Sequence, residues 1–175
     1  MKRAGFIETV QRRVAVVAIG PSTLRGQIRG TVAACREFLA SLPLEQLPAS
    51  SAGRFQDWLD RQTEDLLDQL PASDRPWGAA RKALNIFLRD SLYNQYLNAS
   101  YGLDRAEPWL EIPLDSAVAR GFGAAAGQHA LPQWPGVKHL TREVSDEYQR
   151  FAAEHACSLG VARVNLDMYL WLENR

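Results

Sequence analysis

Apolar side chains recur at helical spacing along most of this chain. The clearest stripe runs from residue 55 to residue 70, where charged side chains fill the remaining face, and it consists of Phe55, Trp58, Leu59, Leu66 and Leu70. The same reasoning predicts helices over about 5–19, 22–42, 55–70, 77–101, 115–127, 141–159 and 161–173. Four β-branched residues between Val14 and Ile19 leave a short strand there as an alternative, but no partner strand is predicted elsewhere.

Glycine and proline separate these periodic segments. Gly20-Pro21 stops the first, Ser22 is expected to cap the second, Pro71 and Gly102 end the next two, and Gly160 divides the last two. No internal repeat or low-complexity linker interrupts the pattern. The prediction is therefore an all-α fold, with residues 1–175 forming a single compact domain of about seven helices.

Composition narrows the class of protein. The content is 46% hydrophobic and 23% charged, which is typical of a globular chain. No apolar run approaches the roughly 20 residues that a membrane span requires. Cys35 and Cys157 lie in helical patterns, and no cysteine or histidine has metal-ligand spacing. We therefore expect a cytoplasmic monomer with buried reduced thiols, no metal, no other cofactor and no membrane partner.

Charge is balanced overall but uneven along the chain. The net charge is zero, which argues mildly against nucleic acid as a partner. However, residues 1–56 carry eight basic and three acidic side chains, whereas residues 57–111 carry six and ten. Arginines outnumber lysines seventeen to three. Arginine suits phosphate oxygens better than lysine does, although a GC-rich genome would produce the same bias.

Candidate chemistry lies in a segment from about 71 to 121. A turn, Asp74 to Gly78, leads into a long helix with Lys82 in its first turns, and an irregular return ends at Asp115, which opens the next helix. Considered separately, Asp115 is typical of a helix N-cap and Lys82 of a solvated side chain. Together they place an amine and a carboxylate, thirty-three positions apart, at the starts of two successive helices.

This order resembles the catalytic segment of helix-hairpin-helix DNA glycosylases. The stretch LEIPLDS followed by VAR, residues 110–116 and 118–120, is similar to the approach to the catalytic aspartate in the archaeal 8-oxoguanine glycosylase branch. The resemblance implies that Asp115 stabilises an oxocarbenium-like transition state at the sugar or activates water. It also implies that Lys82 attacks C1′ and forms a Schiff base, giving lyase activity, or that it only helps to hold DNA.

The resemblance further implies an enzyme that flips a modified base out of double-stranded DNA and excises it to leave an abasic site. Its substrate is expected to be α-glucosyl-hydroxymethylcytosine in phage DNA, as in small bacterial anti-phage glycosylases, or 8-oxoguanine. Two alternatives remain open: a helical interaction module in which Asp115 is only a cap, and a DNA-binding module without catalysis. The first predicts that Lys82 and Asp115 lie far apart or point into solvent.

Several further residues are candidates for contacts with DNA or the base. The hairpin turn departs from the family pattern, with one glycine in place of two, so phosphate binding there would depend on amides from Gly78 onward and on Arg81. The glycine-rich loop 19–30 is either a tight helix contact or a wall of the base pocket, with Ser22 or Gln27 reading the base and Arg25 or Arg29 on phosphate.

The tryptophans are expected mainly in the core, although Trp77 or Trp134 could stack on the extruded base. Trp134 also begins a second hairpin-like stretch, WPGVK at residues 134–138. The aspartate that follows it is Asp167, which lies too near the end of the sequence to be followed by a helix-rich segment. We therefore assign the hairpin to residues 74–78 instead.

Overall fold

The computed structural model describes residues 3–127 and 131–173, and within these ranges the chain is helical with no β-strand. The α-helices are α1 (Arg3–Ala18), α2 (Thr31–Ala40), α3 (Ala52–Gln69), α4 (Trp77–Tyr93), α5 (Gln95–Tyr101), α6 (Ser116–Ala126), α7 (Arg142–Leu159) and α8 (Leu166–Glu173). Short 3-10 helices are η1 (Leu44–Gln46), η2 (Leu103–Trp109), η3 (Val137–His139) and η4 (Arg163–Asn165). The all-α prediction is confirmed, and the strand considered over Val14–Ile19 is wrong, because this stretch forms the end of α1.

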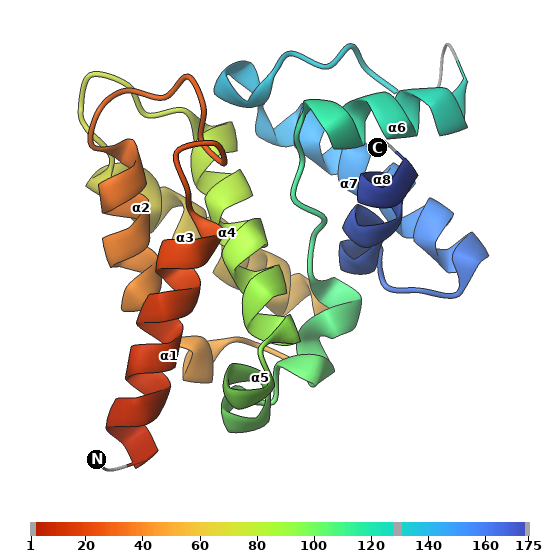
Figure 1. Ribbon diagram of the computed structural model, residues 1–175. Helices are drawn as coiled ribbons and strands as arrows, with labels where there is room; N and C mark the ends of the chain where they lie inside the picture. Colours follow the sequence, from red (N-terminus) through yellow and green to blue (C-terminus); the bar gives the residue numbers. More distant parts are fainter. Residues whose placement is uncertain (1–2, 128–130, 174–175) are drawn as a thin grey trace.

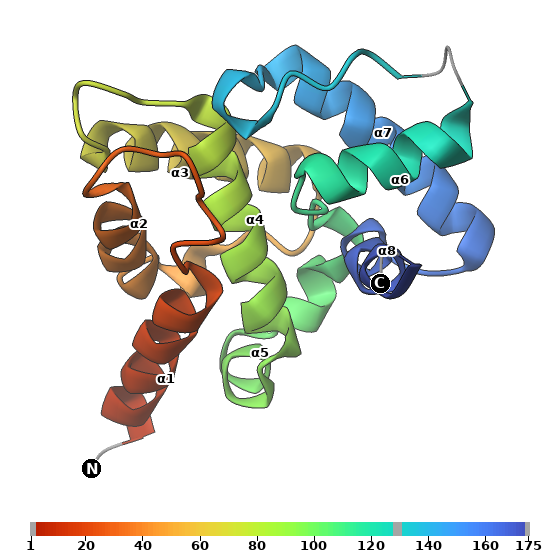
Figure 2. The same ribbon diagram turned by 45° about the horizontal axis from the view of Figure 1, so that its top comes forward.

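Helix α4 runs through the middle of the molecule. In Figure 1, α1 and α2 lie on one side of it, α6, α7 and α8 lie on the other, and α3 crosses behind it. The turned view in Figure 2 shows α6 and α7 side by side in that second group, which agrees with their contacts. Apolar side chains form two buried clusters, one built mainly from α1 to α5 and the other from residues between Ile112 and Leu170.

Capping residues explain most helix boundaries. Ser51, Asp115 and Thr141 accept backbone amides at the starts of α3, α6 and α7, as the sequence predicts for the last two. Gly102 and Gly160 end α5 and α7 in the left-handed conformation, with φ of 63° and 68°. The long fourth helix that we predicted is divided, because Asn94 accepts the amides of Tyr96 and Leu97 and so begins a new helix, α5.

The second helix begins later than predicted. Residues 21–26 form turns, and α2 starts only at Thr31, so Ser22 is not its N-cap. The Thr23 hydroxyl donates to the carbonyl of Ala18, and Arg36 Nε donates to the carbonyl of Ile19 at 2.7 Å. These bonds satisfy carbonyls at the end of α1 and tie the loop to it, which a helix from Ser22 would not do.

In the described ranges, no helix combines the length and the apolar character needed to cross a membrane.

Candidate functional site

The side chains of Lys82 and Asp115 lie beside each other. Lys82 lies on α4, Asp115 lies immediately before α6, and Lys82 Nζ is 3.5 Å from Asp115 Oδ2. The Lys82 side chain is 11% exposed and that of Asp115 is 40% exposed. The amine is therefore largely shielded from water, while the carboxylate remains accessible to a bound molecule.

Asp115 is also the N-cap of α6. Its Oδ1 accepts the amides of Ala117 and Val118 at 2.9 and 3.0 Å. The other oxygen, Oδ2, faces Lys82. The capping interpretation and the catalytic one are therefore compatible, because the two oxygens of one carboxylate serve the two purposes.

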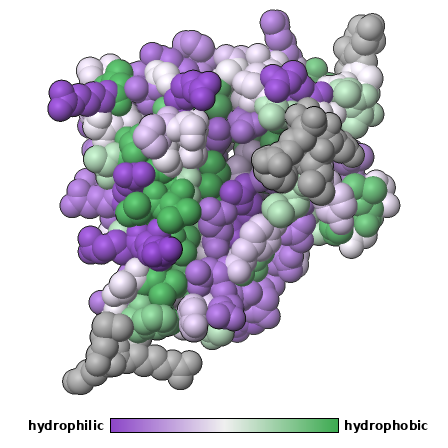
Figure 3. Space-filling view, in the orientation of Figure 1, coloured by the Kyte–Doolittle hydropathy of each residue, from purple (hydrophilic) through white to green (hydrophobic). Residues whose placement is uncertain are grey.

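A polar cleft of about 350 Å³ surrounds this pair. Its described lining comes from the end of α1 and the following loop, one face of α4, the segment before α6, and α8, and consists of Val17, Ala18, Ser22, Thr23, Lys82, Ile86, Arg89, Asp90, Pro113, Asp115 and Asp167. In Figure 3, green atoms gather over α1, which carries the exposed side chains of Val16 and Val17, and the surface is hollowed between that helix and the opposite group of helices.

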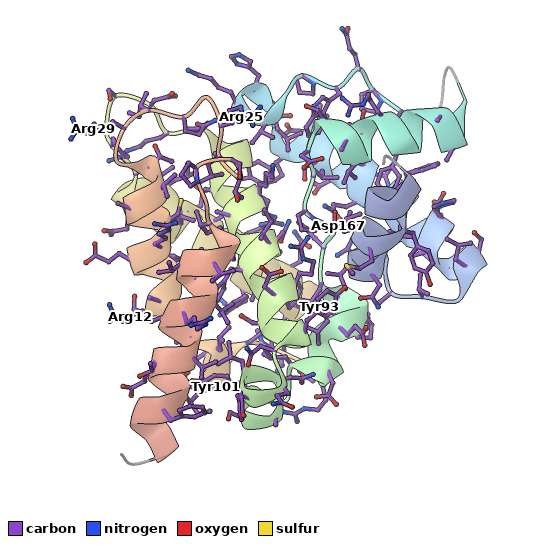
Figure 4. All side chains as sticks on the ribbon, in the orientation of Figure 1. Arg12, Arg25, Arg29, Tyr93, Tyr101 and Asp167 are labelled. Carbon is purple, nitrogen blue, oxygen red and sulfur yellow. The ribbon has the colours of Figure 1, made fainter. Side chains whose placement is uncertain are left out.

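Arg89 and Asp167 are cleft residues that the sequence analysis did not identify. Arg89 donates to Asp167 and, at 2.9 Å, to Asp90, and Figure 4 shows Asp167 between α8 and α4. Burial raises the pKa of Asp167 above its usual range, and the nearby Asp115 and Asp90 raise it further against the opposing effect of Arg89. Arg89 was detectable from its helical spacing to Lys82, whereas Asp167 reaches the cleft only through the packing of α8.

Arg81 does not face the cleft, contrary to the expectation that it contacts DNA. It is 2% exposed, and its guanidinium donates to both oxygens of Glu111, to Asp60 and to Thr63 at 2.8–2.9 Å. Asn85 adds a bond to Glu111 at 2.9 Å. The prediction is wrong because adjacent helix positions point about 100° apart, so Arg81 and Lys82 enter different environments.

Another part of the protein, η3, packs against the predicted hairpin turn. A Cβ on Gly78 would lie 2.3 Å from the carbonyl oxygen of Val137 and 2.6 Å from Cβ of Leu140, so this glycine permits close packing of η3 on α4. Arg81 lies over the Trp77 ring, 5.3 Å from its centroid. The Cβ position of Gly78 is therefore filled by η3, and Trp77 is half-buried with one ring face covered by Arg81.

Trp134 lies beside the start of α6. Its Nε1 donates to the Ser116 hydroxyl at 3.3 Å, and its ring packs edge-on against Tyr148 with centroids 5.4 Å apart. The side chain is half-buried and is not among the described residues that line the cleft. It thus contacts the residue next to Asp115, which was not predicted from the sequence.

The loop after α1 contributes to the cleft through Ser22 and Thr23. Arg25 and Arg29 lie further along this loop and are exposed, as Figure 4 shows. Gln27 is half-buried, and its Oε1 has no hydrogen-bond partner, but it is not among the described cleft-lining residues. The structure therefore brings Ser22 to the cleft that contains Lys82 and Asp115, while the two arginines lie at the surface.

A larger groove of about 1050 Å³ lies between the start of α3, the end of η2 and the end of α7. Several of its polar groups have partners, since Arg163 donates to the carbonyls of Trp109 and Leu110 and Asn165 donates to Glu107, whereas Trp109 Nε1 has none. Because no amine–carboxylate pair lines it, the cleft at Lys82 is the better candidate for chemistry.

In the ranges 3–127 and 131–173, no group of three or more His, Cys, Asp or Glu side chains could hold a metal ion. His129, one of the histidines considered above, lies outside these ranges. Comparisons with protein-family models, curated proteins and solved structures found no match to this chain.

Proposed function

We propose that this protein is a DNA glycosylase that flips a modified nucleotide into the cleft and cleaves its N-glycosidic bond. The observation that carries the proposal is the pairing of Lys82 Nζ with Asp115 Oδ2 at 3.5 Å, in a cleft at the N-terminus of α6. An amine and a carboxylate so placed are the groups required to attack a sugar carbon and to stabilise the positive charge that develops there.

In this mechanism the bond between C1′ and the base nitrogen breaks, and the base leaves with the electron pair and is protonated. Asp115 stabilises the oxocarbenium-like sugar, and the fixed α6 cap keeps its free oxygen in place. If Lys82 is the nucleophile, its ammonium first gives a proton to the Asp115 carboxylate, the neutral nitrogen then bonds to C1′, and Asp115 passes the proton to the leaving base. If water is the nucleophile, Asp115 accepts the proton of the water instead.

The polar lining of the cleft suits a substrate with several hydroxyl groups. Ser22, Thr23 and the carboxylates of Asp90 and Asp167 offer partners for several hydroxyl groups. This supports α-glucosyl-hydroxymethylcytosine as the first substrate to test, because a hexose must exchange many hydrogen bonds with water for bonds with protein. 8-Oxoguanine is the other candidate. In either case double-stranded DNA is the proposed partner, and anti-phage defence is the proposed role for the glucosylated substrate.

The pairing also bears on the alternatives. A module in which Asp115 is only a cap predicts that Lys82 lies elsewhere or in solvent, whereas Lys82 is 11% exposed and beside the carboxylate. A DNA-binding protein that lost catalysis would keep the same geometry. That alternative is therefore separated from the proposal by activity alone.

The test is an excision assay on labelled duplexes containing α-glucosyl-hydroxymethylcytosine, hydroxymethylcytosine, 8-oxoguanine or uracil, followed by alkali to reveal abasic sites. The wild-type protein should cleave one duplex, and Asp115→Asn should not. Borohydride should trap wild-type protein on that DNA if Lys82 forms a Schiff base, and Lys82→Ala should abolish trapping. Binding without excision across the panel would favour the DNA-binding module, and loss of both would favour the interaction module.

A further inference from the structure

The segment that precedes Asp115 is extended, and no strand in the described part of the chain lies beside it. We call residues 110–115, between η2 and α6, the strap. Its side chains at Leu110, Glu111, Ile112 and Leu114 are at most 3% exposed. An extended buried segment needs hydrogen-bond partners for its backbone, and here side chains supply them instead of another strand.

Gln149 on α7 holds the centre of the strap. Its side chain is buried, with Nε2 donating to the carbonyl of Ile112 at 2.8 Å and Oε1 accepting the Ile112 amide at 3.1 Å. One amide group thus satisfies both polar backbone groups of one residue. Because the two bonds are directed, they fix the orientation of the Ile112 backbone as well as its position.

Other side chains hold the strap on the N-terminal side of Ile112. Arg163 donates to the Leu110 carbonyl at 3.0 Å, and Arg81 forms a two-bond ion pair with Glu111. On the C-terminal side, only Pro113 and Leu114 separate Ile112 from Asp115. The proline ring fixes its own φ and restricts Ile112, and Leu114 is buried. A displacement at Ile112 is therefore transmitted to Asp115.

We propose that Gln149 is a positioning residue that sets the place of the Asp115 carboxylate opposite Lys82, acting through the backbone of Ile112. It does not line the cleft itself. The proposal deepens the proposed function and rests on it for its kinetic consequence, while its structural consequence is independent of activity. A misplacement of a reacting group by about 1 Å can cost on the order of 100-fold in rate.

The chain contains a matched control for this role. Gln11 on α1 is buried like Gln149, and its Nε2 donates to the carbonyls of Leu39 and Leu42 at 3.2 and 2.8 Å. It belongs to the other side of the molecule and is not near the strap. Gln11→Met and Gln149→Met therefore remove two buried hydrogen bonds through the same substitution, and only the second frees Ile112.

The kinetic test compares single-turnover excision rates per folded protein for both variants. Gln149→Met should lower the rate by about 100-fold while DNA affinity stays within about twofold, and Gln11→Met should leave the rate within about threefold of wild type. Equal rates for the two variants, or a fall in affinity alone, would overturn the positioning role, because a purely structural glutamine changes how much protein is folded and not how fast the folded protein reacts.

A Gln149→Glu variant adds a pH profile. An ionised carboxylate can accept the Ile112 amide but repels the Ile112 carbonyl, whereas a protonated carboxyl can accept one and donate to the other. The rate of Gln149→Glu relative to wild type should therefore recover at least tenfold as the pH is lowered from 8 to 5. A flat ratio would contradict the proposal. This measurement also serves if Gln149→Met does not fold.

Hydrogen exchange separates this proposal from the proposed function. The amides of Ala117 and Val118 donate to Asp115 Oδ1, so their exchange reports the position of that carboxylate without any substrate. Both amides should exchange at least tenfold faster in Gln149→Met and not in Gln11→Met. A wild-type protein that excises nothing would reject the proposed function, yet exchange would still decide the role of Gln149: unchanged protection would overturn it.

Discussion

Two ion pairs join α4 to the strap, and they differ in almost every respect. Arg81–Glu111 is buried, with both side chains at most 3% exposed and four further hydrogen bonds around it, to Asp60, Thr63, Asn85 and Gln56. Lys82–Asp115 lies one position further along the helix and four along the strap, at 3.5 Å in an open cleft. The first pair is saturated with hydrogen bonds, whereas the second is not.

The difference indicates that the buried pair stabilises the fold, whereas the pair in the cleft is suited to contact a substrate. A buried charge is tolerated only when its hydrogen bonds are complete, and removing one partner leaves the other uncompensated. A reacting group needs the opposite arrangement, with one side fixed and the other free for substrate. Asp115 meets that requirement because the cap holds Oδ1 while Oδ2 faces the cleft. We infer that Arg81 and Glu111 hold the two elements in register so that Lys82 and Asp115 can react.

Asp115→Asn is expected to have the largest effect on the excision rate. Asparagine caps helices as well as aspartate does, so the free energy of unfolding should change by less than about 0.5 kcal/mol. The excision rate should fall by about 10³-fold, because the charge that stabilises the sugar is removed. Thermal unfolding and single-turnover excision measure the two effects. A folded, fully active Asp115→Asn would remove Asp115 from the mechanism.

Glu111→Gln should show the reverse pattern. Burial alone would raise the pKa of Glu111, but Arg81 and the hydrogen bonds from Arg81 and Asn85 lower it below its ordinary value of 4.5. A lowered folded-state pKa stabilises the fold above the unfolded-state value, and this contribution is lost as the pH falls through the folded-state pKa. The variant should therefore be about 3 kcal/mol less stable at pH 7.

Denaturant unfolding at several pH values measures this effect. The gap between wild type and Glu111→Gln should be constant above about pH 5 and shrink as the pH falls below it, because wild-type Glu111 then takes up a proton in the unfolded state before it does so in the folded state. Excision per folded protein should fall less than it does in Asp115→Asn. A gap that does not change with pH would show that Glu111 contributes no ionised carboxylate to the fold.

Replacing each of the two cations by the other type tests whether the two ion pairs have different roles. Arg81→Lys should cost about 2 kcal/mol of stability, because a lysine cannot reproduce the two-bond fork to Glu111 together with the bond to Asp60. Lys82→Arg should cost less than about 0.5 kcal/mol but abolish borohydride trapping, since a guanidinium does not form a Schiff base. Equal stability losses in the two variants would contradict the division of roles.

Helical periodicity and capping signals predicted much of the fold. They located α1, α3, α6 and α7 closely, because these helices have clear apolar stripes or strong caps and stops. They failed at residues 22–30 and at Asn94, where side-chain bonds to the backbone, from Thr23 and Asn94, end or restart helices. Such local bonds compete with helix formation and leave little trace in periodicity.

The site was predictable in part for a similar reason. Family resemblance marks Lys82 and Asp115 as a pair by their order along the chain, and the structure places the two side chains together. Arg81 was misassigned because its role depends on Glu111, which packs on α4 from a distant part of the sequence, and the packing of η3 on Gly78 was not predictable for the same reason. Asp167 and Gln149 carry no local signal, since each reaches its partner from an element distant in sequence.

The smallest effect is expected outside both ion pairs. Arg25 and Arg29 are exposed on the loop whose neighbours Ser22 and Thr23 line the cleft, so the proposed duplex would pass over them. Arg25→Ala combined with Arg29→Ala should weaken DNA binding severalfold and reduce the slope of log K against log salt by about 2, because two phosphate contacts are lost. Excision from the saturated complex should not change, since neither arginine lines the cleft.

Fluorescence anisotropy over a salt series measures the slope, with Arg54→Ala plus Arg61→Ala on α3 as the control for loss of two exposed charges. An equal reduction in both double variants would mean that the duplex is attracted by overall charge and not by this loop.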